Sequence, residues 1–248
     1  MKMVRLIMGM PITIEVKGDG QEAKVKKDIE DVFDYFAYVD ENYSPFKNES
    51  QVGKLNRGEK ITAEMKKILR LSEETKKDTN GYFDIRRPDG SIDPSGLVKG
   101  WAIKNASDIL RKLGYKKFFI DAGGDAEIST GNRSVDAGWK WGIRNPFNTR
   151  EIVKVLSLSN CGIATSGNYE RGNHIYNPKT GVSGETDIVS MTVIGSNVYE
   201  ADRFATAAYA MGTTGIEFIE SRQELEGYMI DKRGIATATS GFRKYEIN

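Results

Sequence analysis

Phe118-Phe119-Ile120-Asp121-Ala122-Gly123-Gly124-Asp125 is the stretch that points most directly to the fold, because a short apolar strand runs straight into a polar, glycine-rich loop. Residues 126–165 continue as several strands, including 139–143 and 153–158. Strands and turns therefore dominate the second half of the chain, and no regular strand–helix alternation follows. The sequence predicts an α+β fold with antiparallel sheet rather than a doubly wound parallel one.

Helices and further strands are expected on both sides of this stretch. Upstream, one strand is predicted at 3–17, and helices at 21–42, at 62–79 after an N-cap at Thr62, and from about Lys99 to a stop at Gly114. Downstream, a strand is predicted at 188–194, helices at 198–211 and 213–221, and closing strands at 228–231 and 235–239. No Pro/Ser linker or repeat interrupts the sequence, so a single domain over residues 1–248 is predicted.

The composition excludes several classes of protein. The chain has 248 residues, with 36 Lys and Arg against 35 Asp and Glu, and this balance argues against a duplex-DNA binder. The only cysteine is Cys161 and the only histidine is His174, which rules out an intrachain disulfide, a CxxC zinc site and an HExxH site. Any metal must rest on oxygen ligands, which favours Mg²⁺ or Ca²⁺. A Ser-His-Asp triad is possible only with His174 as its base.

The beginning of the chain has only a short apolar patch before polar alternation at Thr13, Glu15 and Lys17. A signal peptide needs a longer apolar region, and no stretch approaches the ~18 apolar residues of a membrane span. We therefore expect a cytoplasmic protein without a membrane span, although an exported protein trimmed of its leader would look the same.

Three glycine-rich segments combine close backbone approach with polar groups. They lie at 93–100 before a helix, at 121–125 after a strand, and at 164–168, which is followed by the segment 173–181 around His174. The first could hold a phosphate at a helix N-terminus beside Lys99, but neither a P-loop nor a Rossmann fingerprint is present. Taken singly, the first two are more simply explained as tight turns, and a functional and a structural role for His174 are evenly balanced.

Asp202 and Thr206 lie four residues apart on a predicted helix, so they share a face surrounded by small residues. A carboxylate and a hydroxyl on such a face can hold a hard cation. The simpler alternative is that Asp202 complements the helix dipole and Thr206 bonds back to its own helix.

The order of the motifs is far more specific than any one of them. From the N-terminus they are Met8-Gly9-Met10, Ser44 to Leu55-Asn56, Asp93-x-Ser-Gly-x-x-Lys-Gly100, Asp121-x-Gly-Gly-Asp125, Ala164-Thr-Ser-Gly167, His174-Ile-x-Asn-Pro-Lys-Thr-Gly181 and Ala201-Asp-x-x-Ala-Thr206. Over residues 6–240 this order resembles the ApbE family, the FAD:protein FMN transferases.

The resemblance implies a T-fold-like α+β domain of two interlocked lobes with FAD between them. It also implies an Mg²⁺-dependent reaction in which FMN passes from FAD, through a phosphoester, to a Thr or Ser of a target flavoprotein while AMP leaves. The alternatives are an Mg²⁺-dependent FAD pyrophosphatase that yields FMN and AMP, and a non-catalytic FAD-binding protein. No nucleic-acid partner is expected.

The resemblance also implies roles for individual residues. Asp202 and Thr206 match metal ligands, with a backbone carbonyl near Gly96 as a third. Lys99 would meet a phosphate and His174 would be the base for the incoming hydroxyl. Further cofactor-binding residues are expected from the same motifs: Met10 and Tyr43 against the flavin ring, Asn56 near the metal–phosphate region, and Ser95, Gly96, Asp121, Gly123, Gly124, Asp125, Thr165, Ser166, Gly167 and Thr180.

This sequence departs from the family pattern at a few motif positions. Asn177 and Asn168 stand where the family usually has Asp, Lys179 stands where it has Arg, and Pro94-Ser95 replaces an apolar–Gly pair.

Overall fold

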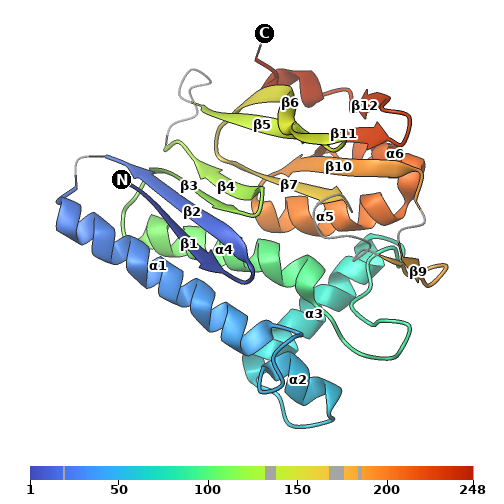
Figure 1. Cartoon of the computed structure of the whole chain (residues 1–248), viewed down its shortest axis with the longest axis horizontal. Coiled ribbons are helices and arrows are strands. Elements are labelled where there is room, and N and C mark those ends of the chain that lie inside the picture. The colour runs from blue at the N-terminus through green and yellow to red at the C-terminus, as the bar shows by residue number, and fades with distance from the viewer. Residues whose placement is uncertain (19, 132–137, 168–175, 184–185, 248) are drawn as a thin grey trace.

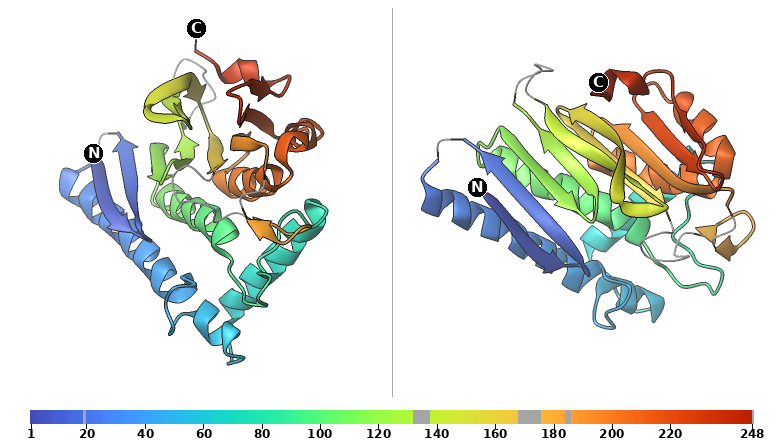
Figure 2. Two further views of the ribbon diagram at one scale, coloured as in Figure 1. Left: turned by 45° about the vertical axis from the view of Figure 1, so that its right-hand side comes forward. Right: turned by 45° about the horizontal axis from the view of Figure 1, so that its top comes forward.

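The computed structural model describes residues 1–18, 20–131, 138–167, 176–183 and 186–247. One long sheet runs through the molecule, with helices along one face and a strand hairpin over part of the other (Figures 1 and 2). Its eight strands follow the order β1-β2-β3-β4-β7-β10-β11-β12, and all neighbouring pairs are antiparallel. The predicted α+β class with antiparallel sheet is therefore confirmed.

The strands of this sheet have the following bounds: β1 Lys2–Ile7, β2 Met10–Lys17, β3 Lys117–Ala122, β4 Asp125–Ser129, β7 Cys161–Gly167, β10 Ile188–Gly195, β11 Glu226–Asp231 and β12 Ala236–Ala238. Two smaller hairpins pair β5 Trp139–Asn145 with β6 Asn148–Leu158, and β8 Tyr176–Asn177 with β9 Val182–Ser183. The eight strands form one continuous sheet, and the division into two interlocked lobes stays a prediction.

The α-helices are α1 Glu22–Tyr43, α2 Gln51–Asn56, α3 Ala63–Asp78, α4 Ser95–Lys112, α5 Val198–Ala210 and α6 Gly215–Glu220. The predicted N-cap is confirmed, because the Thr62 hydroxyl accepts a hydrogen bond from the Met65 N–H. Gly114 follows the end of α4 with φ +92°, so the predicted helix stop is also confirmed. Among the described residues, no helix is both long enough and apolar enough to cross a bilayer.

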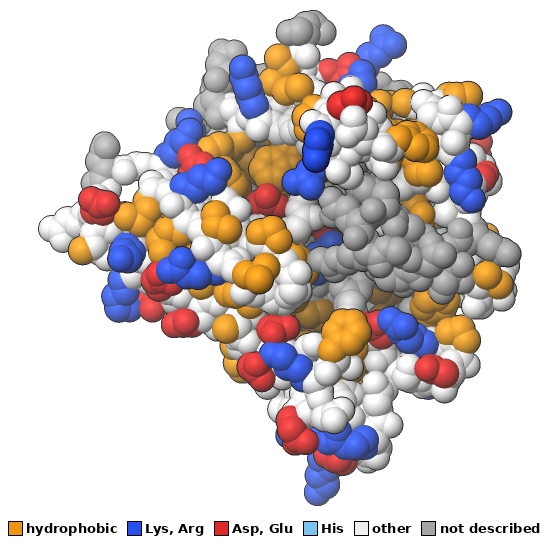
Figure 3. Space-filling model, in the orientation of Figure 1, with side chains coloured by type: hydrophobic (Ala, Val, Ile, Leu, Met, Phe, Trp, Pro, Cys, Tyr) orange, Lys and Arg blue, Asp and Glu red, His pale blue; other side chains and the backbone are white. Residues whose placement is uncertain are grey.

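Strand alternation divides the core between the two faces of the sheet. On β3, Phe118 and Ile120 are buried against α1 and α4, whereas Phe119 packs with Leu156 and Leu158 of the β5–β6 hairpin. A further cluster of buried residues joins α5 and α6 to β10. Lysines, arginines and acidic residues are interspersed over the face seen in Figure 3. The described surface on this side therefore has no basic stripe of the kind a nucleic-acid binder uses.

The sequence analysis missed one hairpin turn and predicted another. The single strand predicted at 3–17 is wrong, because β1 and β2 form a hairpin whose two loop residues, Met8 and Gly9, have φ +56° and +71°. The tight turn predicted at 121–125 is confirmed, with Gly123 and Gly124 at φ +63° and +96° between β3 and β4. Positive φ at both loop residues matches the twist of the flanking strands, so the chain reverses without leaving the sheet.

Two other boundaries differ in ways that matter for the site. Helix α4 begins at Ser95, about one turn before the predicted start near Lys99, because Asp93 accepts hydrogen bonds from the Ser95 N–H and hydroxyl. The third glycine-rich segment begins as a strand, since Thr165 and Ser166 belong to β7 and pair with β10.

Gly162 on β7 allows α5 to begin directly against the sheet. A methyl group at this position would lie 1.9 Å from the backbone nitrogen of Val198 and 2.1 Å from the carbonyl carbon of Asn197. The buried Glu127 of β4 completes the junction, because it accepts a hydrogen bond of 2.7 Å from the same Val198 N–H. Helix α5 is thus fixed at its first residue.

We expect Gly162→Ala to destabilise the fold by about 3 kcal/mol or more, because backbone atoms would have to move. Gly227→Ala on β11 is the matched control, since its methyl group would meet only the side chains of Ile216 and Ile219, at 3.0–3.1 Å. Those side chains can adjust, so a loss of only about 1 kcal/mol is expected. Urea unfolding curves measure both, and equal losses would contradict the close-approach argument.

Candidate active site

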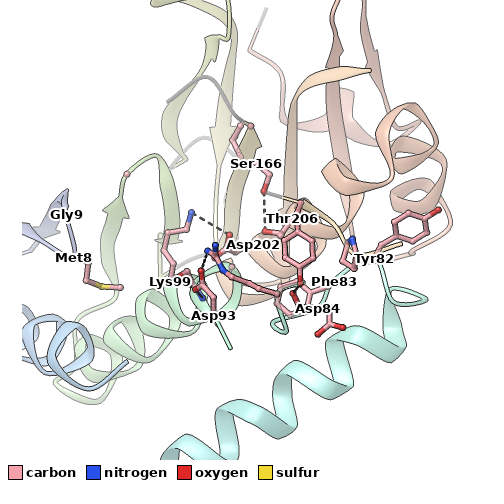
Figure 4. A pocket seen from close by; sticks show the side chains of 18 of the residues that line it. Met8, Gly9, Tyr82, Phe83, Asp84, Asp93, Lys99, Ser166, Asp202 and Thr206 are labelled. Carbon is pink, nitrogen blue, oxygen red and sulfur yellow. Dashed lines mark hydrogen bonds and ion pairs between the residues drawn. The ribbon is translucent and has the colours of Figure 1, made fainter. Parts of the chain in front are cut away.

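A cavity of about 480 Å³ opens where the β1–β2 turn, the beginning of α4, the end of β7 and the middle of α5 converge (Figure 4). This volume is in the range of sites for organic ligands. Its lining residues are Met8, Gly9, Phe46, Tyr82, Phe83, Asp84, Arg87, Asp93, Ser95, Gly96, Lys99, Gly123, Thr165, Ser166, Gly167, Tyr176, Pro178, Asp202 and Thr206.

Helices α4 and α5 meet at the base of the cavity through a glycine. The N–H of Gly100 donates a hydrogen bond of 2.8 Å to Oδ2 of Asp202. A methyl group at Gly100 would lie only 2.7 Å from the Asp202 Cβ, so no larger residue fits without separating the helices. The carboxylate of Asp202 is therefore fixed beside α4.

A cluster of buried charges surrounds this carboxylate. The ammonium of Lys99 forms an ion pair with Oδ2 of Asp125 and lies 3.6 Å from Oδ1 of Asp202. Asp125 is also held by the backbone, because its Oδ1 accepts a hydrogen bond of 3.0 Å from the Thr165 N–H. Burial raises the pKa of Asp202; the Lys99 ammonium opposes that rise and the Asp125 carboxylate adds to it.

The three predicted metal ligands come together at this base. Thr206 lies one turn after Asp202 on α5, and its hydroxyl is 3.4 Å from the hydroxyl of Ser166 (Figure 4). A methyl group at Gly96 would lie 3.4 Å from the Thr206 methyl group and 3.7 Å from its hydroxyl. Gly96, Asp202 and Thr206 therefore line one small region of the cavity.

This donor set suits a hard cation. In the described part of the chain no group of three or more His, Cys, Asp or Glu side chains could hold a metal. One carboxylate and the hydroxyls of Thr206 and Ser166 instead line this region, and all of these donors are oxygens. Mg²⁺ commonly binds through one or two carboxylates together with substrate phosphates, so the residues fit Mg²⁺.

The remaining predicted residues fall into two groups. Ser95, Gly96, Lys99, Gly123, Thr165, Ser166 and Gly167 line the cavity, whereas Met10, Tyr43, Asn56, Asp121, Gly124, Asp125 and Thr180 do not. His174 and Asn168 lie outside the described residues.

The two residues predicted to pack on the flavin ring are core residues. Met10 is buried at the beginning of β2, and the β1–β2 turn places Met8 and Gly9 at the cavity instead. Tyr43 donates a hydrogen bond from its hydroxyl to Glu64, and its ring packs edge-on against Trp101 at 5.7 Å between centroids. Its place in the core follows from its position on the apolar face of α1.

Asn56 and Asp121 bond to the backbone rather than facing the cavity. The Asn56 side chain donates a hydrogen bond of 3.1 Å to the Ile92 carbonyl and accepts one of 2.8 Å from the Ile92 N–H. Oδ1 of Asp121 accepts a hydrogen bond of 2.8 Å from the Gly124 N–H, which closes the β3–β4 turn. Thr180 does the same in the β8–β9 hairpin, where its hydroxyl accepts from the Val182 N–H.

Several lining residues were missed in the sequence analysis. They include an exposed aromatic ring, Phe46, a cation, Arg87, and a buried aromatic, Phe83. Phe46 is 89% exposed, which is unusual for a phenylalanine and marks the rim of the cavity. No periodic signal in the sequence distinguishes the cavity-facing side chains of residues 82–87.

The family model of the ApbE family matches residues 8–88 and 85–229. The chain belongs to the ApbE family. The matched residues include the β1–β2 turn, the beginning of α4, β7 and α5, so the ApbE match covers nearly every element that lines the cavity.

Curated proteins and solved structures agree with this assignment. The chain is 30% identical over 162 residues to the FAD:protein FMN transferase of Escherichia coli K12, which covers 62% of this chain and 46% of that protein. It is 29% identical over 156 residues to the protein of that name from Salmonella typhimurium, covering 59% and 44%. The chain thus spans about half the length of the curated relatives it matches.

Two ApbE structures have the same fold. The flavin transferase ApbE from Vibrio cholerae superimposes with a TM-score of 0.85 at 20% identity, covering 99% of this chain and 98% of that one. The ApbE protein from Thermotoga maritima gives a TM-score of 0.86 at 18% identity, covering 100% and 99%. At these identities the likeness shows the fold.

We expect Asp121→Asn to remove a pH-dependent loss of stability. Burial raises the pKa of Asp121 to about 6 from its ordinary 3.8. Between these values the folded state keeps a proton that the unfolded chain has released, so this group destabilises the fold as the pH rises through that window. The asparagine variant should be more stable than the wild type by on the order of 1–3 kcal/mol at pH 7, with no difference near pH 3.

Urea unfolding at pH 3 to 8 measures this difference. Asp34→Asn, which alters an exposed carboxylate on α1, is the control and should show no such window. A difference between Asp121→Asn and the wild type that stays constant with pH would contradict the prediction.

Proposed function

We propose that the protein is an Mg²⁺-dependent FAD:protein FMN transferase. The observation that carries the proposal is the meeting of Asp202, Thr206 and Gly96 beside Lys99, at the base of a cavity whose walls come from the segments matched by the ApbE family. The curated relatives named FAD:protein FMN transferase support the reaction. FAD would be the substrate, and a second flavoprotein would be the acceptor.

The groups at the floor of the cavity suit phosphoryl transfer. In this reaction catalysis is mostly positioning and neutralisation of charge on the phosphate oxygens. When bound, Mg²⁺ would supply charge neutralisation at the pyrophosphate, held by Asp202, Thr206 and the Gly96 carbonyl. Lys99 adds a positive charge whose position is fixed by Asp125.

The proposed acceptor is a Ser or Thr hydroxyl on a separate protein. A hydroxyl is a weak nucleophile at neutral pH, so a base must take its proton as the new P–O bond forms and AMP leaves. We propose His174, the only histidine of the chain, as that base. The cytoplasmic location and the target motif of the acceptor stay predictions.

One incubation separates this reaction from its alternatives. The protein is mixed with FAD, Mg²⁺ and a peptide that carries a Ser/Thr flavinylation motif, and the products are analysed by mass spectrometry. A gain of one FMN on the peptide with release of AMP is expected. Free FMN and AMP would indicate a pyrophosphatase instead, and unchanged bound FAD would indicate a carrier.

We expect Asp202→Asn to lower turnover by at least about 100-fold, because a neutral amide holds Mg²⁺ more weakly than a carboxylate and the cation would then no longer neutralise the pyrophosphate. Excess EDTA on the wild type should have a similar effect. Asp31→Asn, an exposed carboxylate on α1, is the control and should keep wild-type turnover. Stopped assays that quantify AMP give the turnover rates of both variants. Wild-type turnover in Asp202→Asn would show that Asp202 is only a structural contact between helices.

We expect His174→Ala to retain FAD binding but transfer FMN at least roughly 100-fold more slowly, the magnitude of a lost general base. No other histidine can replace it. Single-turnover transfer to the peptide and FAD titration of the same variant test this. A fall in transfer of less than about threefold would exclude His174 as the base, and loss of FAD binding would make it a residue of the binding site.

A further inference from the structure

A tight hairpin at residues 85–93 forms one wall of the cavity and is held together by backbone hydrogen bonds. The Arg87 N–H donates to the Ser91 carbonyl at 2.8 Å, and the Asp93 N–H donates to the Ile85 carbonyl at 2.7 Å. At the tip, the Gly90 N–H donates to the Arg87 carbonyl, and Gly90 has φ +86°, which favours glycine. The position of the hairpin backbone is therefore well defined.

Asn56 attaches this hairpin to α2. Its amide makes two hydrogen bonds with the backbone N–H and carbonyl of Ile92, as a neighbouring strand would. The two residues are 36 positions apart in the chain, so the contact fixes the hairpin from outside its own segment. Asn56 thus helps to fix where the cavity-facing side of the hairpin lies, together with Tyr176, whose hydroxyl donates to the Arg86 carbonyl.

The hairpin places two adjacent arginines in different surroundings. The side chain of Arg87 lines the cavity and pairs with Asp93, while Arg86 is exposed and lies outside the lining. Asp93 uses its other oxygen to accept hydrogen bonds from the Ser95 N–H and hydroxyl at the beginning of α4. Asp93 therefore ties the guanidinium of Arg87 to the N-terminal turn of that helix.

Lys99 and Arg87, which both line the cavity, differ in exposure and in how many acidic partners each already has. Lys99 is 20% exposed and lies between two almost fully buried carboxylates, Asp125 and Asp202. Arg87 is 43% exposed, and its guanidinium has five N–H donors, of which one nitrogen meets Asp93. A planar guanidinium group that has further N–H donors is a usual partner of a phosphate group.

We propose that Arg87 binds a phosphate of the dinucleotide in this cavity, and that Asn56 is a residue that positions it. The inference rests on the proposed function for the nature of the ligand, FAD. It also accounts for the place of Asn56, which contacts the Ile92 backbone rather than lining the cavity. The two segments matched by the ApbE family model meet at residues 85–88, so this hairpin lies where the family pattern is not continuous.

Flavin fluorescence titrations with FAD, FMN and riboflavin test the proposal without any turnover. Arg87→Met should weaken binding of FAD and FMN by about 10- to 100-fold, the loss of a charged hydrogen-bonding group, and leave riboflavin binding unchanged. Arg86→Met is the matched control and should stay within about twofold of the wild type for all three ligands. Arg87→Lys should recover part of the FAD affinity, because it restores the charge without the fork.

Asn56→Ala separates positioning from direct contact. It should weaken FAD binding in the presence of Arg87, and it should cause little further loss in the Arg87→Met background. Equal affinities of Arg87→Met and Arg86→Met would overturn the proposal, as would an equal loss for riboflavin. A wild type that binds FAD but modifies no acceptor would contradict the proposed function and still leave these titrations decisive for Arg87.

Discussion

Gly100 allows α4 and α5, which come from distant parts of the chain, to pack closely enough for a backbone N–H to contact the other helix. The remainder of the site depends on that contact. Its N–H holds the Asp202 carboxylate, which lies 102 residues further along the chain. The same contact places Lys99 of α4 beside Asp202 of α5. A carboxylate in this position would be costly to bury alone, so the adjacent ammonium and N–H donor are what allow it to remain there.

The antiparallel sheet determines which motifs meet. Strand β4 lies between β3 and β7, so the Asp125 carboxylate at the beginning of β4 reaches the Thr165 N–H across 40 residues of sequence. The buried Glu127 on the same strand accepts from the Val198 N–H at the beginning of α5. One central strand therefore connects Lys99, through Asp125, to the helix that bears Asp202 and Thr206.

The sequence was a reliable guide where a side chain's role is local and periodic. The apolar face of α1, the Thr62 cap and the small-residue helix around Asp202 follow from spacing alone, and each is found at its predicted place. It was a poor guide where a polar side chain bonds to backbone far away in sequence. Asn56 is such a case. Nothing in its own segment indicates that its amide group would donate a hydrogen bond to the Ile92 carbonyl and accept one from the Ile92 N–H. The Met8-Gly9 turn was missed because it lacks the usual Asn-Gly or Asp-Gly signal.

The two hairpin turns, Met8-Gly9 and Gly123-Gly124, belong to strand pairs that are neighbours in the sheet, since β2 pairs with β3. Residues from both turns reach the cavity. Surface loops between strands tolerate added residues, because the extra chain runs into solvent and leaves the core unchanged. The fold thus separates a fixed group of charges, carried by α4, α5 and β4, from cavity-lining turns whose outline can change by insertion. Related proteins could accept partners of different shape by lengthening these turns, without altering a single residue that holds the charges.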